Sequence, residues 1–327
     1  MRSYYLTFVV NISAKIKTDQ LLSHPFDQYQ RYQDVRGVIE AIQSQTQNNT
    51  LTLLDVGGSP LALKFLSNYP VVTANIEVDA GVKLQADGAR LPFTDKSFDI
   101  VITVDTLEHV PAAQREAFIN ELLRVTGAYT IITGPFANGY NEMAETTLND
   151  FLTEVVGLQH RFLLEHLQNG LPHLEECLHW ISKISQNYLV IPSGYTHNWL
   201  PLMLIKHYLG RLADGQTLST ELDRLYNYKC YWSDHRLPSY RQVVIVAKSG
   251  HFDVLAKIKD AFEPPQEIPT PDLNGVMAMA QALSWVQFLE ERDKEIKRLQ
   301  RLVSGYESGR FIRFMAKIQQ LIRLIKS

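Results

Sequence analysis

Short apolar runs alternate with segments of helical period along the middle of the chain. A continuous apolar run of about four to eight residues is typical of a buried parallel strand, whereas apolar residues spaced by three and four predict a helix. Residues 112–124 have the helical pattern, and the strand-like runs lie at residues 51–56, 71–79, 100–104, 129–134, 188–192 and 242–247. The alternation predicts an α/β fold with a doubly wound sheet of seven strands, whose ligand crevice lies outside the carboxyl ends of the strands.

Two connections are much longer than the rest. Residues 137–187 and 194–239 separate the last three strand candidates, and both exceed the usual connection of about 2 to 6 residues plus a helix. Insertions at the ligand edge are typically lids or substrate platforms, so we expect helical lid insertions that determine the substrate. Residues 1–50 predict an N-terminal extension followed by a helix that begins near Pro25.

A glycine pair and two carboxylates indicate a nucleoside ligand. The first strand closes on Asp55, Gly57 and Gly58, and the second closes on Glu77, where a carboxylate would meet a ribose. As a dinucleotide fingerprint the loop is incomplete, because serine stands at its second required glycine and alanine at its third. These features alone leave a nucleotide-dependent oxidoreductase or epimerase open, together with other nucleoside-binding enzymes.

The segment that follows discriminates between these classes. Residues 86–110, which include Ala-Asp-Gly-Ala-Arg-Leu-Pro-Phe, Ser-Phe-Asp and Asp-Thr-Leu-Glu-His-Val, resemble the central signature of class I S-adenosylmethionine-dependent methyltransferases of the type 11-like group. The resemblance implies a Rossmann-like methyltransferase domain, which we assign to residues 51–250, and S-adenosylmethionine as cofactor. It places Asp55, Gly57 and Gly58 on the loop at the methionine end, Glu77 on the ribose, and Asp87 and Gly88 at the adenine. Asp105, which ends the fourth strand, completes the implied cofactor contacts. The resemblance also implies that the helix near Pro25 is a lid helix, so Tyr29 and Tyr32 either contact the ligand from it or pack the helix on the sheet.

The glycine loop departs from the family pattern. Ser59 and Leu61 stand where the family usually has two further glycines, and only glycine adopts positive φ or close backbone approach at little cost. Either the loop is reshaped or cofactor binding is weakened. A non-catalytic scaffold that keeps the fold and has lost the ligand therefore remains an alternative.

Histidines are the candidate general bases, because their ordinary pKa lies near neutrality and an acceptor hydroxyl has to lose a proton. The resemblance places His109 near the transferred methyl group, and the first insertion adds His160 and His166. Glu165 is a candidate substrate contact, but on a helix it points about 100° away from its neighbour His166, so the two do not predict a dyad. Each histidine has the alternative of an ordinary solvated or locally packed side chain.

The second insertion ends in an aromatic cluster with interleaved polar groups, residues 226–241. Such a cluster suits stacking against a sugar or another flat apolar face, with Asp234, His235 and Arg236 as polar contacts. The same residues could equally form core.

Composition and cysteine content limit the class of protein that the chain can form. The chain has 327 residues, 45% hydrophobic and 20% charged, which is typical of a globular protein with one large core and appendages. The two cysteines, Cys177 and Cys230, have no spacing that predicts a disulfide framework or zinc, so we expect no metal site and a cytoplasmic, reducing location. The apolar run at residues 4–10 is too short for a signal peptide or a transmembrane helix.

The C-terminal region changes character. Residues 251–281 are a Pro-rich linker region, and residues 282–327 predict a coiled coil followed by a basic amphipathic helix. From Glu291 onward there are ten Lys and Arg against four Asp and Glu, whereas the rest of the chain has 22 against 31. We expect self-association through residues 282–303 and contact of residues 309–327 with the inner face of a membrane, with a partner or intramolecular helix as the alternative. Because the main domain is acidic, we expect no nucleic acid.

The start of this helix adds a second, short resemblance. Residues 306–315 resemble the tails of bacterial enzymes of surface-polysaccharide assembly. The two resemblances together favour O-methylation of a saccharide or lipid-linked glycan, as a step of polysaccharide biosynthesis at the cytoplasmic face.

Overall fold

The fold is taken from a computed structural model, which describes residues 20–45, 50–77, 81–212, 215–251, 253–265, 288, 291–306 and 309–326. Seven strands form one sheet in the order β3-β2-β1-β4-β5-β7-β6. Their bounds are β1 Leu53–Val56, β2 Val71–Asn75, β3 Leu84–Gln85, β4 Phe98–Val104, β5 Thr126–Pro135, β6 Tyr188–Tyr195 and β7 Ser239–Ala247. Neighbouring strands from β3 to β5 are parallel, and β7 runs antiparallel to both β5 and β6. The predicted Rossmann-like, seven-stranded α/β sheet is confirmed.

The strand order reverses beside β1. β2 and β3 lie on one side of β1, and β4 and β5 lie on the other. In the middle of this arrangement Asp55 pairs with Thr73 of β2 and with Ile102 of β4. A reversal of this kind opens a crevice at the carboxyl ends of the central strands, where a ligand can reach the backbone.

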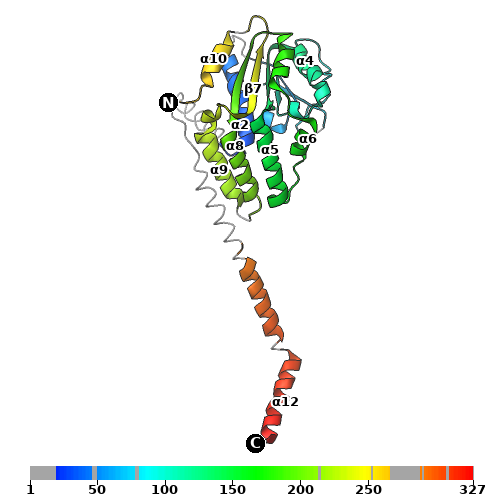
Figure 1. The fold of residues 1–327 in the computed structure, drawn as a ribbon, viewed down its shortest axis with the longest axis vertical. Coiled ribbons are helices and arrows are strands. Elements are labelled where there is room, and N and C mark those ends of the chain that lie inside the picture. Colours follow the sequence, from blue (N-terminus) through cyan, green and yellow to red (C-terminus); the bar gives the residue numbers. More distant parts are fainter. Residues whose placement is uncertain are drawn as a thin grey trace, which may run out of the picture.

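Helices cover both faces of the sheet, because successive strand residues point to opposite faces. Leu53 and Ile100 pack in a core cluster with residues of α2 (Phe26–Gln43), α3 (Pro60–Phe65) and α10 (Val254–Ala261). Leu54 and Val101 face the opposite way, toward α4 (Arg115–Val125) and α7 (Leu174–Ser182). Figure 1 shows α10 and α4 on opposite sides of the sheet.

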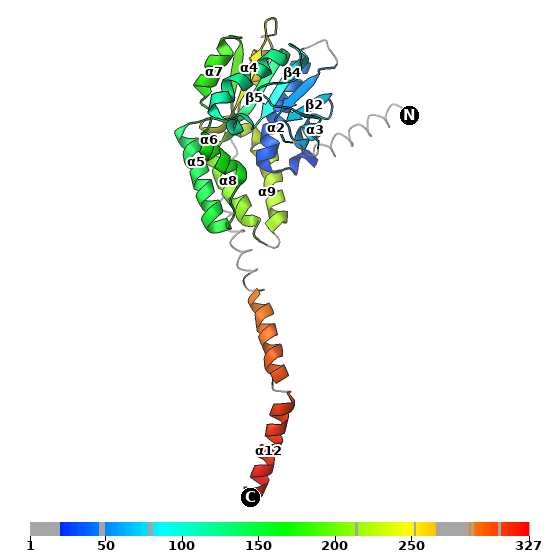
Figure 2. The same ribbon diagram turned by 90° about the vertical axis from the view of Figure 1, so that its right-hand side faces the viewer.

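Both insertions are helical. The first contains α5 (Gly139–Phe151), which continues into a π-helical turn at Leu152–Val156, then α6 (Arg161–Asn169) and α7. The second contains α8 (Thr196–Leu209) and α9 (Gly215–Lys229), followed by a 3-10 turn at Tyr231–Asp234. In Figures 1 and 2, α5, α8 and α9 extend together beyond one end of the sheet. They share a third core cluster with Phe26, so the insertions have a hydrophobic core of their own.

The aromatic segment before β7 belongs to the core. Tyr226 and Tyr231 are each 1% exposed. The hydroxyl of Tyr231 donates to the buried carboxylate of Asp34 on α2, and Nε2 of His235 lies 2.8 Å from the same carboxylate. Ser193 of β6 donates to it as well. For Tyr226, Tyr231 and His235 the structure favours the packing interpretation of the two that the sequence left open, whereas Tyr228 and Trp232 are exposed.

The C-terminal region begins later than the sequence predicted. α10 follows residue 250, and Val254, Ile258 and Phe262 are buried against α2 and the sheet, so the core extends past the predicted domain end. Residues 291–306 form a helix with Ile296, Leu299 and Val303 exposed, and α12 (Arg310–Lys326) follows. Figures 1 and 2 show both helices standing away from the sheet.

Part of the predicted C-terminal architecture falls outside the described residues. Residues 266–287 are not described, and they include most of the Pro-rich linker region. The first positions of the predicted coiled-coil seam, Trp285 and Leu289, also lie outside the described residues. Pairing between copies of the seam therefore stays a prediction. Among the residues that the structure covers, no helix is long and apolar enough to cross a lipid bilayer.

Replacing Asp34 with asparagine tests the buried network. The side-chain NH2 group of asparagine would face hydroxyl donors that now bind the Asp34 carboxylate. We therefore expect a loss of about 3 kcal/mol in the free energy of unfolding. Glu40→Gln, at an exposed position of the same helix, should change it by less than about 0.5 kcal/mol. Urea unfolding followed by circular dichroism measures both, and equal midpoints for the two variants would contradict the assignment.

Candidate active site

A large cavity lies at the carboxyl edge of the central strands. Its volume is about 690 Å³, and residues of the loops after β1, β2 and β4 line it together with residues of α2, α6, α8 and β7. This size is within the range of pockets that hold cofactors and small substrates. The crevice that the sheet topology predicts is therefore present, with helices of both insertions over it.

The glycine loop after β1 is tight. Gly57 has φ +79°, and a Cβ at this position would come within 2.2 Å of Oγ1 of Thr106. A Cβ at Gly58 would come within 2.6 Å of Oδ2 of Asp55. Both positions therefore require glycine, and both line the pocket.

The structure shows why Ser59 and Leu61 are tolerated in place of glycines. Ser59 is the N-cap of α3, with extended backbone at φ −118°, and its hydroxyl oxygen accepts from the backbone N–H of Leu61. Leu61 is already in the first turn of the helix, so neither residue needs positive φ. Tyr32 of α2 shares a hydrogen bond with the Ser59 hydroxyl. The loop is reshaped, which is the first of the two consequences that the sequence allowed.

Asp55 lies beneath this loop with an unusual environment. Its side chain is 0% exposed, and neither carboxylate oxygen has a hydrogen-bond partner in the described part of the chain. Burial raises the pKa of Asp55 to about 7. A buried carboxylate without partners is costly unless a ligand supplies a positive charge or a donor.

The remaining predicted cofactor contacts lie around the pocket. Glu77, Asp87 and Gly88 all line it. Asp87 accepts from the backbone N–H of Ala89, which forms a turn at this position. Glu77 is ion-paired with Arg161 at the start of α6, at 2.7 Å. A Cβ at Gly88 would come within 2.2 Å of the Phe118 ring, so this glycine is also required by packing on α4.

Asp105 has two arginine partners. It follows β4 with φ +43°, a conformation that non-glycine residues rarely adopt. Its carboxylate accepts from Arg31 of α2 and from Arg241 of β7, at 2.6 to 2.9 Å. Arg241 also donates to Asp27, which accepts from Trp199 of α8 as well. Sequence reasoning missed both arginines, because no local motif marks them.

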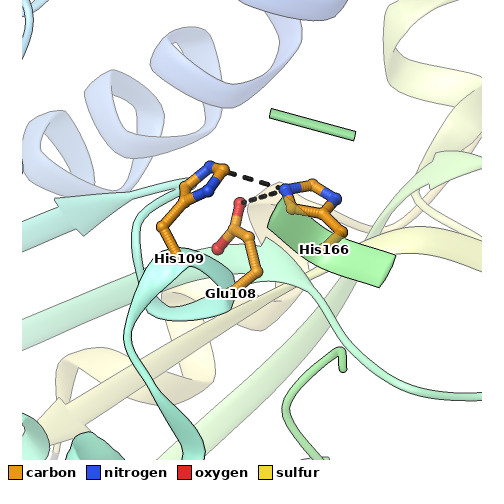
Figure 3. Close-up of side chains that lie close together, drawn as sticks. All are labelled: Glu108, His109 and His166. Carbon is orange, nitrogen blue, oxygen red and sulfur yellow. Dashed lines mark hydrogen bonds and ion pairs between the residues drawn. The ribbon is translucent and has the colours of Figure 1, made fainter. Parts of the chain in front are cut away.

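Two histidines meet at the other end of the pocket. Nε2 of His109 and Nε2 of His166 are 3.4 Å apart (Figure 3). Nδ1 of His166 lies 2.8 Å from a carboxylate oxygen of Glu145, and Nδ1 of His109 lies 3.0 Å from one of Glu165. As the sequence predicted, Glu165 and His166 do not form a dyad with each other; each has a different partner. Glu145 was not predicted, since only the fold brings α5 beside α6.

Glu108 lies below this pair and is 1% exposed. Burial, with the nearby charge of Asp105, raises the pKa of Glu108 to about 8. Burial and the neighbouring His166 lower the pKa of His109. For His166 burial acts in the same direction, but the hydrogen bond to Glu145 and the charge of Glu108 together raise its pKa.

The other predicted residues divide between pocket and core. His160 precedes α6 and lines the pocket, and burial lowers its pKa. Asp234 and His235 are 0% and 3% exposed and bind Tyr226, Asn198 and Asp34. Arg236 stacks on the ring of Tyr195, 4.0 Å from its centre. None of these last three residues lines the pocket, so the structure does not bring them to the predicted acceptor site.

Comparison with known proteins identifies the domain. Residues 51–129 match the family model of a methyltransferase domain. Uncharacterized methyltransferases of Mycobacterium avium and Mycolicibacterium vanbaalenii are 33% and 36% identical over 117 and 120 residues, which are 29% of this chain and 45% of each relative. The chain thus spans less than half the length of these curated relatives.

Among solved structures, the plantazolicin methyltransferase BpumL in complex with SAH has a TM-score of 0.41 at 11% identity, covering 74% of this chain and 99% of that one. A possible histamine N-methyltransferase from Thermotoga maritima has a TM-score of 0.40 at 13% identity, covering 70% and 99%. The family match, on the strands that bear the glycine loop, shows that the chain carries a class I S-adenosylmethionine-dependent methyltransferase domain. The rest of the chain lies outside the matched region.

The residues present fit the cofactor of this family. S-adenosylmethionine carries an ammonium group at its methionine end, and Asp55 has two buried oxygens without partners beneath the loop at that end. The loop itself has no room for a Cβ at either glycine. Glu77 and Asp87 line the pocket at the ends of the next strands, where hydroxyl and amino groups of a nucleoside find acceptors.

Asp55→Asn tests the buried carboxylate through the pH dependence of stability. With a pKa of about 7 when folded against an ordinary value of 3.8, Asp55 stays protonated to higher pH in the folded state, so stability falls as pH rises from 4 to 7. The total loss is on the order of 4 kcal/mol, which asparagine would avoid. We expect the ligand-free variant to gain stability over the parent protein at pH 8 relative to pH 4.

Urea unfolding at the two pH values measures this difference. Asp150→Asn, at an exposed position on α5, is the control and should follow the parent protein. A pH dependence that is the same with and without the Asp55 carboxylate would show that Asp55 titrates normally.

Proposed function

We propose that the protein transfers a methyl group from S-adenosylmethionine to a hydroxyl group of a small acceptor. The observation that carries the proposal is the sheet edge of the matched domain, where the glycine loop, Glu77 and Asp87 line the same cavity as a histidine pair, and the buried Asp55 lies directly before the loop. Bound S-adenosylmethionine would supply a methyl group that is already activated by the positive sulfur. The protein then has to position the acceptor, exclude water and accept a proton.

The cofactor end would be formed by residues of three strands. Gly57 and Gly58 let the backbone approach the methionine end, and Asp55 accepts from its ammonium group. Glu77 would accept from the ribose hydroxyls, for which it has to leave Arg161. Because this ion pair is 64% exposed on both sides, its loss costs little. Asp87 and Gly88 would border the adenine.

The acceptor end would be formed by the histidines. Glu145 and Glu165 favour a proton on Nδ1 of His166 and His109, which leaves Nε2 of each as the atom that can take the proton of an acceptor hydroxyl. His160 lies in the same pocket, has no carboxylate partner among the residues that the structure describes, and is the other candidate. The ring of Phe162 makes an edge contact with the His109 ring, with 5.2 Å between the ring centres.

For the acceptor we propose a saccharide or a lipid-linked glycan. The pocket wall combines the stacked rings of Trp199 and Tyr240, 3.6 Å between centres, with the charged groups of Asp27, Arg31 and Arg241. An apolar face bordered by fixed polar groups is the combination that a sugar ring requires.

We also propose that α12 binds the surface of an anionic membrane. Phe314, Ile318 and Leu321 recur at intervals of four and three, so they share one side of the helix. Arg313, Lys317 and Arg323 lie outside this stripe, and α12 contains no acidic residue. Since each basic residue near an anionic leaflet contributes about 1 kcal/mol, the helix combines the two terms that hold a peripheral segment at a bilayer.

Asp87→Ala tests the cofactor assignment. Calorimetric titration of the full chain with S-adenosylmethionine and S-adenosylhomocysteine should give micromolar affinity, and the variant should lose at least about tenfold, because the carboxylate that would accept from the adenine amino group is removed. Asp95→Ala, outside the pocket, is the control. If the chain binds NAD or NADP and does not bind S-adenosylmethionine or S-adenosylhomocysteine, the oxidoreductase alternative is favoured. If it binds none of these four ligands, the non-catalytic scaffold is favoured. Saccharides head the acceptor screen that follows.

Phe314→Glu with Leu321→Glu tests the helix. Placing two carboxylates in the apolar stripe should abolish co-sedimentation with vesicles that contain anionic lipid, because it removes apolar burial and reduces the positive charge. Gln319→Glu with Gln320→Glu adds the same charge outside the stripe and should weaken binding only partly. Equal binding by the two double variants would show that charge alone holds the protein at the vesicle, and no binding by the parent chain would exclude the proposal.

A further inference from the structure

The histidine pair has a geometric problem that a proton or a metal ion would solve. Each Nδ1 faces a carboxylate, at 2.8 Å for His166 and 3.0 Å for His109, and a carboxylate favours the tautomer with the proton on Nδ1. The two Nε2 atoms are 3.4 Å apart, which is a hydrogen bond only when one of them carries the proton. With both protons on Nδ1, the two lone pairs face each other. Two lone pairs at this distance repel unless a positive charge lies between or beside them.

A third group points to the same place. Glu108 follows β4, its side chain is 1% exposed, and its Oε2 atom has no hydrogen-bond partner among the described residues. Its Oε1 atom is 4.0 Å from Nε2 of His166. One ligand atom from each of Glu108, His109 and His166 lies within 4.8 Å of the others, and Figure 3 shows the three side chains converging from two elements.

We propose that Glu108, His109 and His166 bind a divalent transition-metal ion. Bonds of about 2.0 to 2.1 Å from a metal to imidazole nitrogen, at a tetrahedral angle, separate the two nitrogens by roughly 3.4 Å, which is the distance that the structure has. The carboxylate oxygen is 4.0 Å from Nε2 of His166, and the three ligand atoms lie within 4.8 Å of one another, so Glu108 needs to approach by roughly 1 to 1.5 Å to complete the set. Two imidazoles and one carboxylate select transition metals over Mg²⁺ and Ca²⁺, which prefer oxygen ligands.

The surrounding residues support this assignment independently. In metal sites a ligating histidine commonly donates its other ring N–H to a carboxylate, which fixes the ring and raises its basicity. Glu145 lies in this position for His166, and a carboxylate oxygen of Glu165 is 3.0 Å from Nδ1 of His109, although the pair is not aligned as a hydrogen bond. Glu145 is 2% exposed and also accepts from the hydroxyl of Tyr240, so its own orientation is fixed. Both carboxylates come from the first insertion, outside the region that the family model matches.

Three protein ligands leave a coordination position for a further oxygen. All three ligand residues line the cavity, and a hydroxyl bound to the ion would lose its proton more readily, because the metal lowers its pKa. This role for the ion rests on the proposed function. In it, the ion would hold the acceptor hydroxyl and make it easier to deprotonate. The two histidines then serve as ligands, and the proton passes to water or to His160.

Direct metal binding is the test, and it needs no substrate. The full chain is stripped with chelator and titrated with Co²⁺, followed by its visible absorption, and with Zn²⁺ by calorimetry. We expect one ion per chain at micromolar affinity or better. Glu108→Gln and His166→Ala should each weaken binding more than tenfold, and Glu145→Gln should weaken it about 10- to 100-fold through the orientation of His166.

His160→Ala is the matched control, because it removes a histidine of the same pocket outside the proposed ligand set, and its affinity for Co²⁺ should equal that of the parent. Calorimetric binding of S-adenosylhomocysteine to every variant shows that the pocket is folded. No binding by the parent chain, or equal binding by Glu108→Gln and the parent, would overturn the proposal. Neither result would touch the proposed methyl transfer, which fails separately if the cofactor does not bind.

Discussion

The structure depends on two arginines, one buried and one partly buried, that lie between two aspartates. Arg241 of β7 is 2% exposed and binds Asp105 and Asp27, while Arg31 of α2 binds the same two carboxylates. Burial opposes ionisation of Asp27, but the two guanidinium groups hold its pKa well below the usual range. A buried ion pair adds little net stability, yet removing one partner leaves an uncompensated charge. The network therefore specifies where α2, β4 and β7 meet more than how strongly they adhere.

This constraint shapes the pocket. α2 can cover the crevice only where Arg31 and Asp27 reach the sheet edge, and this position brings Tyr32 to Ser59 of the glycine loop. Asp105 is held at positive φ by the same contacts, and Glu108 and His109 follow it in a single 3-10 turn. The orientation of the histidine pair is thus coupled to the arginines. Nη1 of Arg241 and Nε of Arg31 have no partner in the part of the chain that the structure covers, which leaves donors for an anionic group of a ligand.

Short-range sequence patterns predicted the fold and the glycine loop. The remaining features of the pocket and core depend on contacts between residues that are far apart in the sequence. Apolar runs and the glycine pair are short-range patterns, so the sheet, the loop and the helical insertions could be predicted from them. The role of Ser59 required knowing that α3 begins at Pro60, because a helix N-cap needs no positive φ. Asp34 binds residues 159 to 201 positions away, and no pattern in the sequence shows that these residues meet. For the same reason the aromatic segment could not be assigned to core or surface beforehand.

Some pocket residues belong to the segment that matches the methyltransferase family, and others are contributed by the rest of the chain. The matched residues 51–129 supply the glycine loop, Glu77, Asp87 and the turn with Glu108 and His109. Glu145, Arg161 and His166 come from the first insertion, and Arg241 comes from β7. α6 connects the two ends, because Arg161 contacts Glu77 beside the proposed ribose site and Glu165 contacts His109. Each proposed cofactor contact lies in the matched segment, whereas His166, Glu145 and Arg241, which complete the acceptor end, lie outside it. A comparison limited to that segment can therefore identify the methyl donor and cannot identify the acceptor.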